Sequence, residues 1–286
     1  MPKPPGSNPF KGRMFKIGLQ FSLIAVVFII IFAAFYACQA SSKPKFDYDN
    51  VNLIQYKVPS DNTPVAVFET SKGTFKAIIY KDEVPNFAEY FIKLVNNGYY
   101  NGTHVFAVQK DVYFMGGSKA KDGTDTNDTN KDTMNQELSP NLWPFKGALI
   151  SFGDKGGSVF NKQVLSGSRI LFVNSVEFDD EFKKQLDSTN GNDSLIETFK
   201  EKGGVPNFSQ QYTIFGQVYD GMDVYDKICG SDCVDSENLQ PQDDITFDKV
   251  YMSTYGENKN DDFFKTESSS SGDSSSAVDS ETDSVQ

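Results

Sequence analysis

The chain has 286 residues, of which 38% are hydrophobic and 14% aromatic, enough for a domain with a substantial core and for additional segments. Its net charge is −12, and because the first sixteen residues carry +4, the remainder carries −16. Such an acidic body offers no positive surface to nucleic acid, so we exclude nucleic acid as a partner.

The N-terminal region predicts attachment to a membrane. Residues 1–16 form a basic segment, and residues 17–37 are 21 consecutive residues without a charge. A helix of that length spans about 30 Å, the thickness of the hydrocarbon core of a bilayer. The basic flank predicts a single-pass transmembrane helix with a cytoplasmic N-terminus and the body on the extracytoplasmic side of a bacterial cell membrane. Two alternatives stay open, namely a cleaved signal peptide and a lipoprotein acylated at Cys38.

The segments that follow predict a linker, a hairpin and a helix. Residues 38–63 are polar, which is typical of a linker between membrane and domain. Two β-type runs at residues 65–70 and 74–80 flank a Lys-Gly turn and predict a β-hairpin. Pro85 and Gly98 bound an amphipathic helix whose apolar side chains fall on one face.

A two-stranded ribbon is expected next. Its strands, residues 103–108 and 112–115, lie between an Asn-Gly turn and the pair Gly116-Gly117. Residues 119–133, which are rich in Asp, Asn and Thr, predict an exposed loop.

The second half of the chain is again mainly β. Strands at short spacing without βαβ alternation predict a closed antiparallel barrel within a domain of residues 64–257. Residues 177–204 interrupt the pattern as an insertion of two short amphipathic helices, and residues 258–286 predict an acidic, Ser-rich, disordered tail. The remaining expected elements are strands at 147–152, 168–174, 212–219 and 245–255, a loop at 153–167 and a short helix at 221–228.

Three separated segments carry recognisable motifs in a fixed order. Residues 68–102 contain G-T-F-K-A-I-I-Y, P-N-F-A-E-Y-F and G-Y-Y-N-G-T, and the Gly-Gly pair of the ribbon is followed later by K-G-A-L. The third and most specific segment, residues 212–228, reads Y-T-I-F-G-Q-V-Y-D-G-M-D-V-Y-D-K-I. Together they resemble the cyclophilin-type peptidyl-prolyl cis-trans isomerases. The resemblance implies a mainly β fold, a closed eight-stranded antiparallel barrel capped by two helices.

The resemblance also implies an activity. Rotation about an X-Pro amide is slow because resonance gives the C–N bond a barrier of about 18–20 kcal/mol. A catalyst needs an apolar pocket for the proline ring and a hydrogen-bond donor that stabilises the twisted amide. It needs neither a metal nor a cofactor, so we expect none. The expected partners are proline-containing polypeptides, such as secreted or envelope proteins that are folding.

The residues that would perform this chemistry depart from the family pattern. In the family the donor is an arginine in a Phe-His-Arg run of the ribbon, and here that run is Val105-Phe106-Ala107. A glutamine further along the ribbon corresponds to Met115. A tryptophan and the histidine that follows it fall near Asn207 and on Tyr212. The positions that the resemblance places in a substrate groove are Val112, Tyr113, Met115, Leu171, Phe208 and Tyr212.

Arg169 is the one catalytic candidate left by these departures. The chain has only two arginines, and Arg169 is the only one after residue 37. It stands where the family has a glutamine that faces the same groove. Our hypothesis is that Arg169 reaches the substrate and partly replaces the donor lost at Ala107. The alternative is a surface cation on a strand.

The cysteines and the histidine offer little other chemistry. Cys229 and Cys233 are close enough in sequence for a disulfide, with two unpaired thiols as the alternative. His104 is the only histidine, so a metal site or a catalytic triad lacks partners. The sequence thus predicts an isomerase that assists the folding of extracytoplasmic proteins. The alternative is a cyclophilin-like module, catalytically weak or inactive, that binds peptides or proteins.

Overall fold

A computed structural model describes residues 51–124, 134–153, 155–158, 161–189, 192–234 and 239–265. The chain divides into two compact units, residues 1–47 and residues 48–286, and all described residues belong to the second. The expected transmembrane stretch at residues 17–37, Cys38 and residues 266–286 of the expected tail lie outside the described residues. Within the described ranges, no helix combines the length and the apolar character needed to cross a bilayer.

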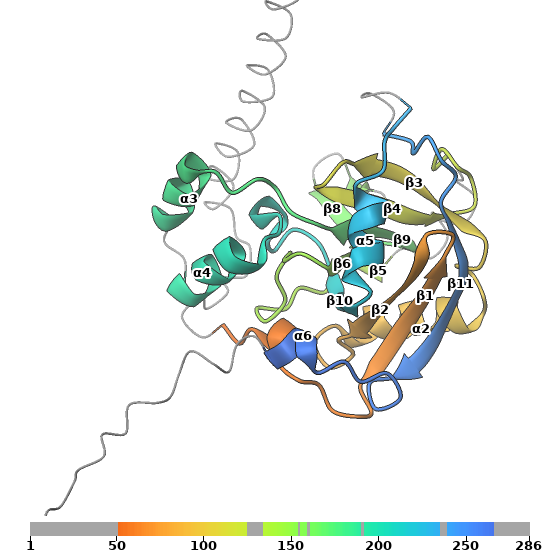
Figure 1. The fold of residues 1–286 in the computed structure, drawn as a ribbon, viewed down its shortest axis with the longest axis horizontal. Coiled ribbons are helices and arrows are strands. Elements are labelled where there is room, and N and C mark those ends of the chain that lie inside the picture. Colours follow the sequence, from red (N-terminus) through yellow and green to blue (C-terminus); the bar gives the residue numbers. More distant parts are fainter. Residues whose placement is uncertain are drawn as a thin grey trace, which may run out of the picture. The chain divides into compact units, whose positions relative to one another are not determined.

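Eight antiparallel strands close into a barrel (Figure 1). Around the barrel they follow the order β1-β11-β3-β4-β9-β6-β10-β2. This confirms the eight-stranded antiparallel barrel that the sequence predicted. The strands are β1 (Pro64–Thr70), β2 (Gly73–Ile79), β3 (Thr103–Gln109), β4 (Tyr113–Ser118), β6 (Ala148–Phe152), β9 (Arg169–Val173), β10 (Ile214–Asp220) and β11 (Thr246–Thr254).

Aromatic rings fill the interior of the barrel. Phe114 of β4 stacks on Phe172 of β9 with ring centroids 4.5 Å apart, and Phe68 stacks on Phe75 at 4.8 Å. Phe247 of β11 meets Phe172 edge-on at 5.7 Å. Stacked and edge-to-face pairs of this kind add to the hydrophobic gain of burial, so the core fixes which face of each strand points inward.

Two helices pack against the barrel. Helix α2 (Pro85–Asn96) places Phe87 and Phe91 against Phe215 of β10, with centroids 4.9 and 4.8 Å apart. Helix α5 (Met222–Cys229) buries Tyr225, whose hydroxyl donates to the carbonyl of Val173. Pro at the first helical position of α2 fits its start, because that N–H has no helical partner to lose.

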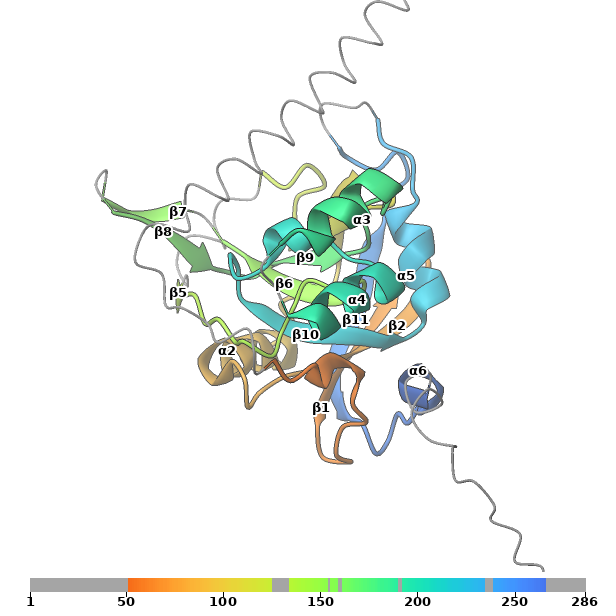
Figure 2. The ribbon, with the colours of Figure 1, turned by 90° about the vertical axis from the view of Figure 1, so that its left-hand side faces the viewer.

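Two helices and a small three-stranded sheet lie beside the barrel. Helices α3 (Asp180–Asp187) and α4 (Asp193–Lys202) occupy the segment expected to be a helical insertion, and each begins with an Asp or Asn side chain that accepts from a backbone N–H. The segment 153–167, expected to be a loop, instead forms a hairpin (Figure 2). Its strands β7 (Lys155–Ser158) and β8 (Asn161–Ser166) join β5 (Met134–Asn135) in a small sheet. The loop prediction was wrong because this segment lacks the apolar alternation by which strands were recognised.

The boundaries of the domain also differ from the sequence prediction. The expected linker, 38–63, contains the 3-10 helix η2 (Ile54–Tyr56), in which the Gln55 side chain is fully buried. Gln55 hydrogen-bonds the backbone N–H and carbonyl of Trp143 and the side chain of Gln217, so the folded domain begins before residue 64. At the other end α6 (Asp262–Lys265) buries Phe264, so the domain extends past residue 258.

Candidate functional site on the ribbon face

The ribbon formed by β3 and β4 keeps its shape through its two exit glycines. A Cβ on Gly116 would lie 2.6 Å from the ring of Phe247, so only glycine leaves room for that core residue. Gly117 has φ of +93°, a conformation that L side chains rarely adopt. Since β4 alternates, Phe114 points into the core and Tyr113 and Met115 point to the opposite face.

A row of apolar side chains crosses this outer face. Ala107 of β3 pairs with Met115 of β4, which in turn pairs with Leu171 of β9. Directly opposed residues in antiparallel strands lie about 4.5–5.5 Å apart at Cβ, so the three side chains are neighbours. None of them can donate a hydrogen bond. We call the outer surface of β3, β4 and β9 the ribbon face.

Aromatic side chains border the ribbon face on one side. The ring of Tyr113 lies 6.2 Å from that of Phe208, and Phe208 meets Tyr212 at 5.8 Å with the rings perpendicular. Tyr212 in turn lies 6.3 Å from Phe152, the strand neighbour of Arg169. We call these four residues, Tyr113, Phe208, Tyr212 and Phe152, the aromatic border.

Arg169 lies at the edge of the ribbon face, next to Phe152 of the aromatic border. It begins β9, and its guanidinium carbon lies 5.1 Å from the centroid of the Phe106 ring on β3. Such a cation–π contact stabilises a charge that has left part of its water. Because Phe106 directly precedes Ala107, the guanidinium lies beside the ribbon position where the resemblance would place an arginine.

A short loop holds this arrangement in place. One guanidinium nitrogen of Arg169 donates to the backbone carbonyl of Gly123. Gly123 has φ of +71°, and a Cβ there would lie 2.5 Å from the Phe106 ring, so the loop backbone rests on that ring. The Asp122 carboxylate accepts from the N–H and hydroxyl of Thr124, and these bonds lower the pKa of Asp122. Arg169, Phe106 and Gly123 thus form one contact cluster.

The structure brings most of the sequence-predicted groove residues together. Tyr113, Met115, Leu171, Phe208 and Tyr212 lie on or beside the ribbon face, through the strand pairs and ring contacts described above. Val112 lies just before β4, where its backbone carbonyl accepts from Asn174, and it packs against the main core. Sequence reasoning did not single out Phe106, Phe152 or Gly123 as site residues. The sequence offers a signal for Phe106 alone, because it stands where the family run Phe-His-Arg has a histidine.

Cys229 and Cys233 are not joined by a disulfide in the structure. Cys229 is buried at the end of α5, and burial raises the pKa of its thiol to about 12. The thiol of half-buried Cys233 donates to the carbonyl of Val108 at 3.0 Å. Of the two alternatives that the sequence left open, the structure does not have the disulfide.

His104 belongs to a surface ion-pair cluster. Its Nδ1 lies 2.7 Å from a carboxylate oxygen of Asp244, which also pairs with Lys121. Hydrogen bonding to Lys121 and to His104 lowers the pKa of Asp244. In the part of the chain that the structure describes, no group of three or more His, Cys, Asp or Glu side chains is placed to hold a metal ion.

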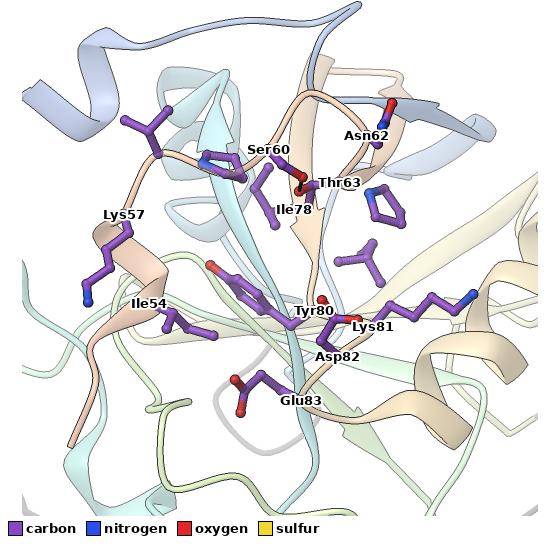
Figure 3. Close-up of a pocket in the computed structure, with 14 residues that line it drawn as sticks. Ile54, Lys57, Ser60, Asn62, Thr63, Ile78, Tyr80, Lys81, Asp82 and Glu83 are labelled. Atoms are coloured by element: carbon purple, nitrogen blue, oxygen red, sulfur yellow. Dashed lines mark hydrogen bonds between the residues drawn. The ribbon is translucent and has the colours of Figure 1, made fainter. Parts of the chain in front are cut away.

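A cavity of about 530 Å³ lies elsewhere on the domain. Its walls are the segment at residues 54–64 and the end of β2 with the loop after it, residues 78–83 (Figure 3). Lys57, Lys81, Asp82 and Glu83 line it, and it includes no residue of the ribbon face. Its mixed charges and open rim point to no particular ligand.

The barrel and the ribbon face together define a class: a closed antiparallel β-barrel with an apolar and aromatic outer face flanked by a single arginine. The family model described as "Cyclophilin type peptidyl-prolyl cis-trans isomerase/CLD" matches residues 65–252. Because this match spans well over half of the chain, the protein belongs to the cyclophilin-type peptidyl-prolyl isomerase family.

Individual proteins are also similar to this chain. A protein of Staphylococcus saprophyticus, named provisionally as a peptidyl-prolyl cis-trans isomerase, is 27% identical over 188 residues, which cover 64% of this chain and 89% of the relative. A Staphylococcus epidermidis protein of the same name is 27% identical over 171 residues, covering 60% and 83%. A solved cyclophilin type peptidyl-prolyl cis-trans isomerase of Cryptosporidium parvum aligns with a TM-score of 0.49 at 19% identity, covering 68% of this chain and 98% of that one.

Proposed function

We propose that this protein binds proline-containing polypeptide segments on the ribbon face and accelerates their cis-trans isomerisation, with Arg169 as the donor. One observation carries the proposal: the guanidinium lies over Phe106, next to Ala107, where the family pattern has its arginine. On this proposal, Arg169 of β9 supplies the hydrogen-bond donor that the family pattern places at position 107 of β3.

The proposed mechanism needs no covalent step. The proline ring packs against the apolar row Ala107, Met115 and Leu171, and the aromatic border limits its movement. As the amide twists, its resonance is lost and the proline nitrogen becomes a better hydrogen-bond acceptor. An N–H of Arg169 directed at that nitrogen binds the twisted state more tightly than either planar state, which lowers the barrier.

A specific observation favours a second candidate, a peptide-binding module with little catalysis. The guanidinium of Arg169 already donates to the Gly123 carbonyl, so reaching a substrate requires it to exchange or share that bond. Breaking the bond to Gly123 costs free energy, and the hydrogen bond to the twisted amide regains some. If the cost is larger than the gain, the face binds X-Pro segments without accelerating their rotation.

One assay separates these two functions. Full-length protein in detergent micelles is mixed with a blocked Ala-Ala-Pro-Ala peptide, and cis-trans exchange and binding are measured by NMR spectroscopy. Uncatalysed isomerisation takes tens of seconds, so cis-trans exchange on a shorter timescale supports the isomerase function. Binding without acceleration supports the module. Absence of binding contradicts both functions and would move attention to another surface.

We further propose that the domain works on the extracytoplasmic side of a membrane, where it assists secreted or envelope proteins. The uncharged residues 17–37 and the basic residues before them support this placement. Protease added to intact cells should then digest the domain. A Cys38→Ser variant should stay in the membrane fraction if residues 17–37 are the anchor, and its release would favour the lipoprotein alternative.

A further inference from the structure

Two tyrosine hydroxyls on the aromatic border take no part in holding the fold together. Four buried tyrosines elsewhere direct theirs to a partner within the fold: Tyr100, Tyr219 and Tyr225 donate to backbone carbonyls, and Tyr255 donates to Asp261. Tyr113 and Tyr212 are half-buried, and across the described ranges their hydroxyls form no hydrogen bond. A tyrosine held in a partly apolar place normally directs its hydroxyl to a partner. This contrast suggests that their partner is a ligand.

Contacts with Phe208 hold the rings of Tyr113 and Tyr212 in place. Both rings contact Phe208, at centroid distances of 6.2 Å for Tyr113 and 5.8 Å for Tyr212. Burial raises the pKa of both Tyr113 and Tyr212, and for Tyr113 the neighbouring Tyr212 adds a smaller increase. Both hydroxyls therefore stay protonated, and able to donate, across the whole physiological pH range.

The chemistry of a proline segment complements this arrangement. Proline has a carbonyl but no N–H, so an X-Pro segment offers more acceptors than donors. The centre of the ribbon face, formed by Ala107, Met115 and Leu171, has no side-chain donor to meet those carbonyls. The two tyrosines supply donors at its edge, and both pack on Phe208, an apolar ring that can contact the proline.

We propose that the hydroxyls of Tyr113 and Tyr212 bind the main-chain carbonyls that flank the proline of a bound X-Pro segment. They fix the position of the segment while Phe208 packs against the proline ring between them. This inference rests on the proposed function, because it names how the same face holds its ligand.

Tyr→Phe substitutions test the inference, because they remove the hydroxyl and keep the ring packing. Binding of blocked Ala-Ala-Pro-Ala to full-length protein in micelles is measured for Tyr113→Phe, Tyr212→Phe and the double variant. Each single change should weaken binding about fivefold, the usual effect of one lost hydrogen bond. Tyr251→Phe, on β11 away from the ribbon face, is the matched control and should bind as the wild type does.

A modified peptide gives a readout that a purely structural role would not change. Replacing the carbonyl before proline by a thiocarbonyl, a weaker acceptor, should weaken binding to the wild type and leave binding to the double variant nearly unchanged. Equal affinity of wild type and double variant for Ala-Ala-Pro-Ala would overturn the inference and leave the proposed function intact. A wild type that binds no X-Pro peptide would overturn the proposed function, and this inference with it.

Discussion

At the scale of single residues, our proposal is that the ribbon face is the substrate site and that its chemical groups are placed differently from the family pattern. Ala107 and Met115 stand where the family pattern has donors, while Arg169 on another strand directs its charge toward the same place. The sequence indicated the loss at Ala107 and the candidate at Arg169. It could not show the contact between Arg169, Phe106 and Gly123, because three segments far apart in the chain form it.

Returning the donor to the ribbon should raise activity. In an Arg169→Ala background, Ala107→Arg places a guanidinium at the family position beside Met115 and Leu171. We expect its kcat/KM for an X-Pro peptide to exceed that of Arg169→Ala by about 100-fold, the typical effect of one preorganised donor. An increase in binding without an increase in kcat would contradict the view that the donor acts on the twisted amide. Ala107→Leu in the same background controls for added volume.

At the scale of elements, prediction succeeded where the apolar alternation was strong and failed where it was weak or absent. The hairpin β1–β2, the ribbon β3–β4 and helix α2 were confirmed, since apolar residues recur with period 2 or 3.6 in them. The hairpin β7–β8 was missed in a Gly-rich segment. Helix η2 was not predicted because its most buried residue, Gln55, is polar, and polar residues in this segment indicated a linker.

Gln55 should matter for stability far more than a linker residue would. Gln55→Ala leaves the backbone N–H of Trp143 and the side-chain oxygen of Gln217 without their partners in a buried place. Each unsatisfied buried group costs about 1–3 kcal/mol, so we expect the free energy of unfolding to fall by about 2–4 kcal/mol. Urea unfolding measures it, with Asn62→Ala, an exposed change in the same connecting segment, as the control. A loss below about 0.5 kcal/mol, the usual range of a surface change, would show that this segment is not part of the fold.

The end of α5 makes a second prediction at this scale. Because burial raises the pKa of Cys229 to about 12, its thiolate is scarce at pH 8, and iodoacetamide should modify it only after unfolding. Half-buried Cys233 should react faster in the native protein. Peptide mapping by mass spectrometry reports both sites. Two cysteines that stay unmodified in denaturant until a reductant is added would show that they form the disulfide instead.

The raised pKa of Cys229 also sets a limit on stability at high pH. As the pH rises, the thiol in the unfolded chain, with a pKa of about 8.5, loses its proton before the buried thiol of the folded protein does. Unfolding is therefore increasingly favoured as the pH rises from about 8.5 toward 12, and Cys229→Ser should reduce that dependence.

At the scale of the whole molecule, the barrel supplies the rigid frame and surface contacts decide the function. Its core of stacked phenylalanines fixes the inward face of β4 and β9, so Tyr113, Met115, Arg169 and Leu171 are held on the outer face. The same frame could serve catalysis or binding alone, and fold does not choose between them. The choice depends on whether one guanidinium reaches the twisted amide.

Cis-trans exchange of an X-Pro peptide, measured for the wild type and Arg169→Ala, tests this account most directly. We expect the wild type to accelerate exchange and Arg169→Ala to lose at least about tenfold in kcat/KM, with a smaller change in binding. Lys249→Ala is the matched control, since Lys249 also lies over an aromatic ring, that of Tyr251, but on β11. It should keep the wild-type rate. An isomerase rate that is the same for the wild type and Arg169→Ala would contradict the central claim.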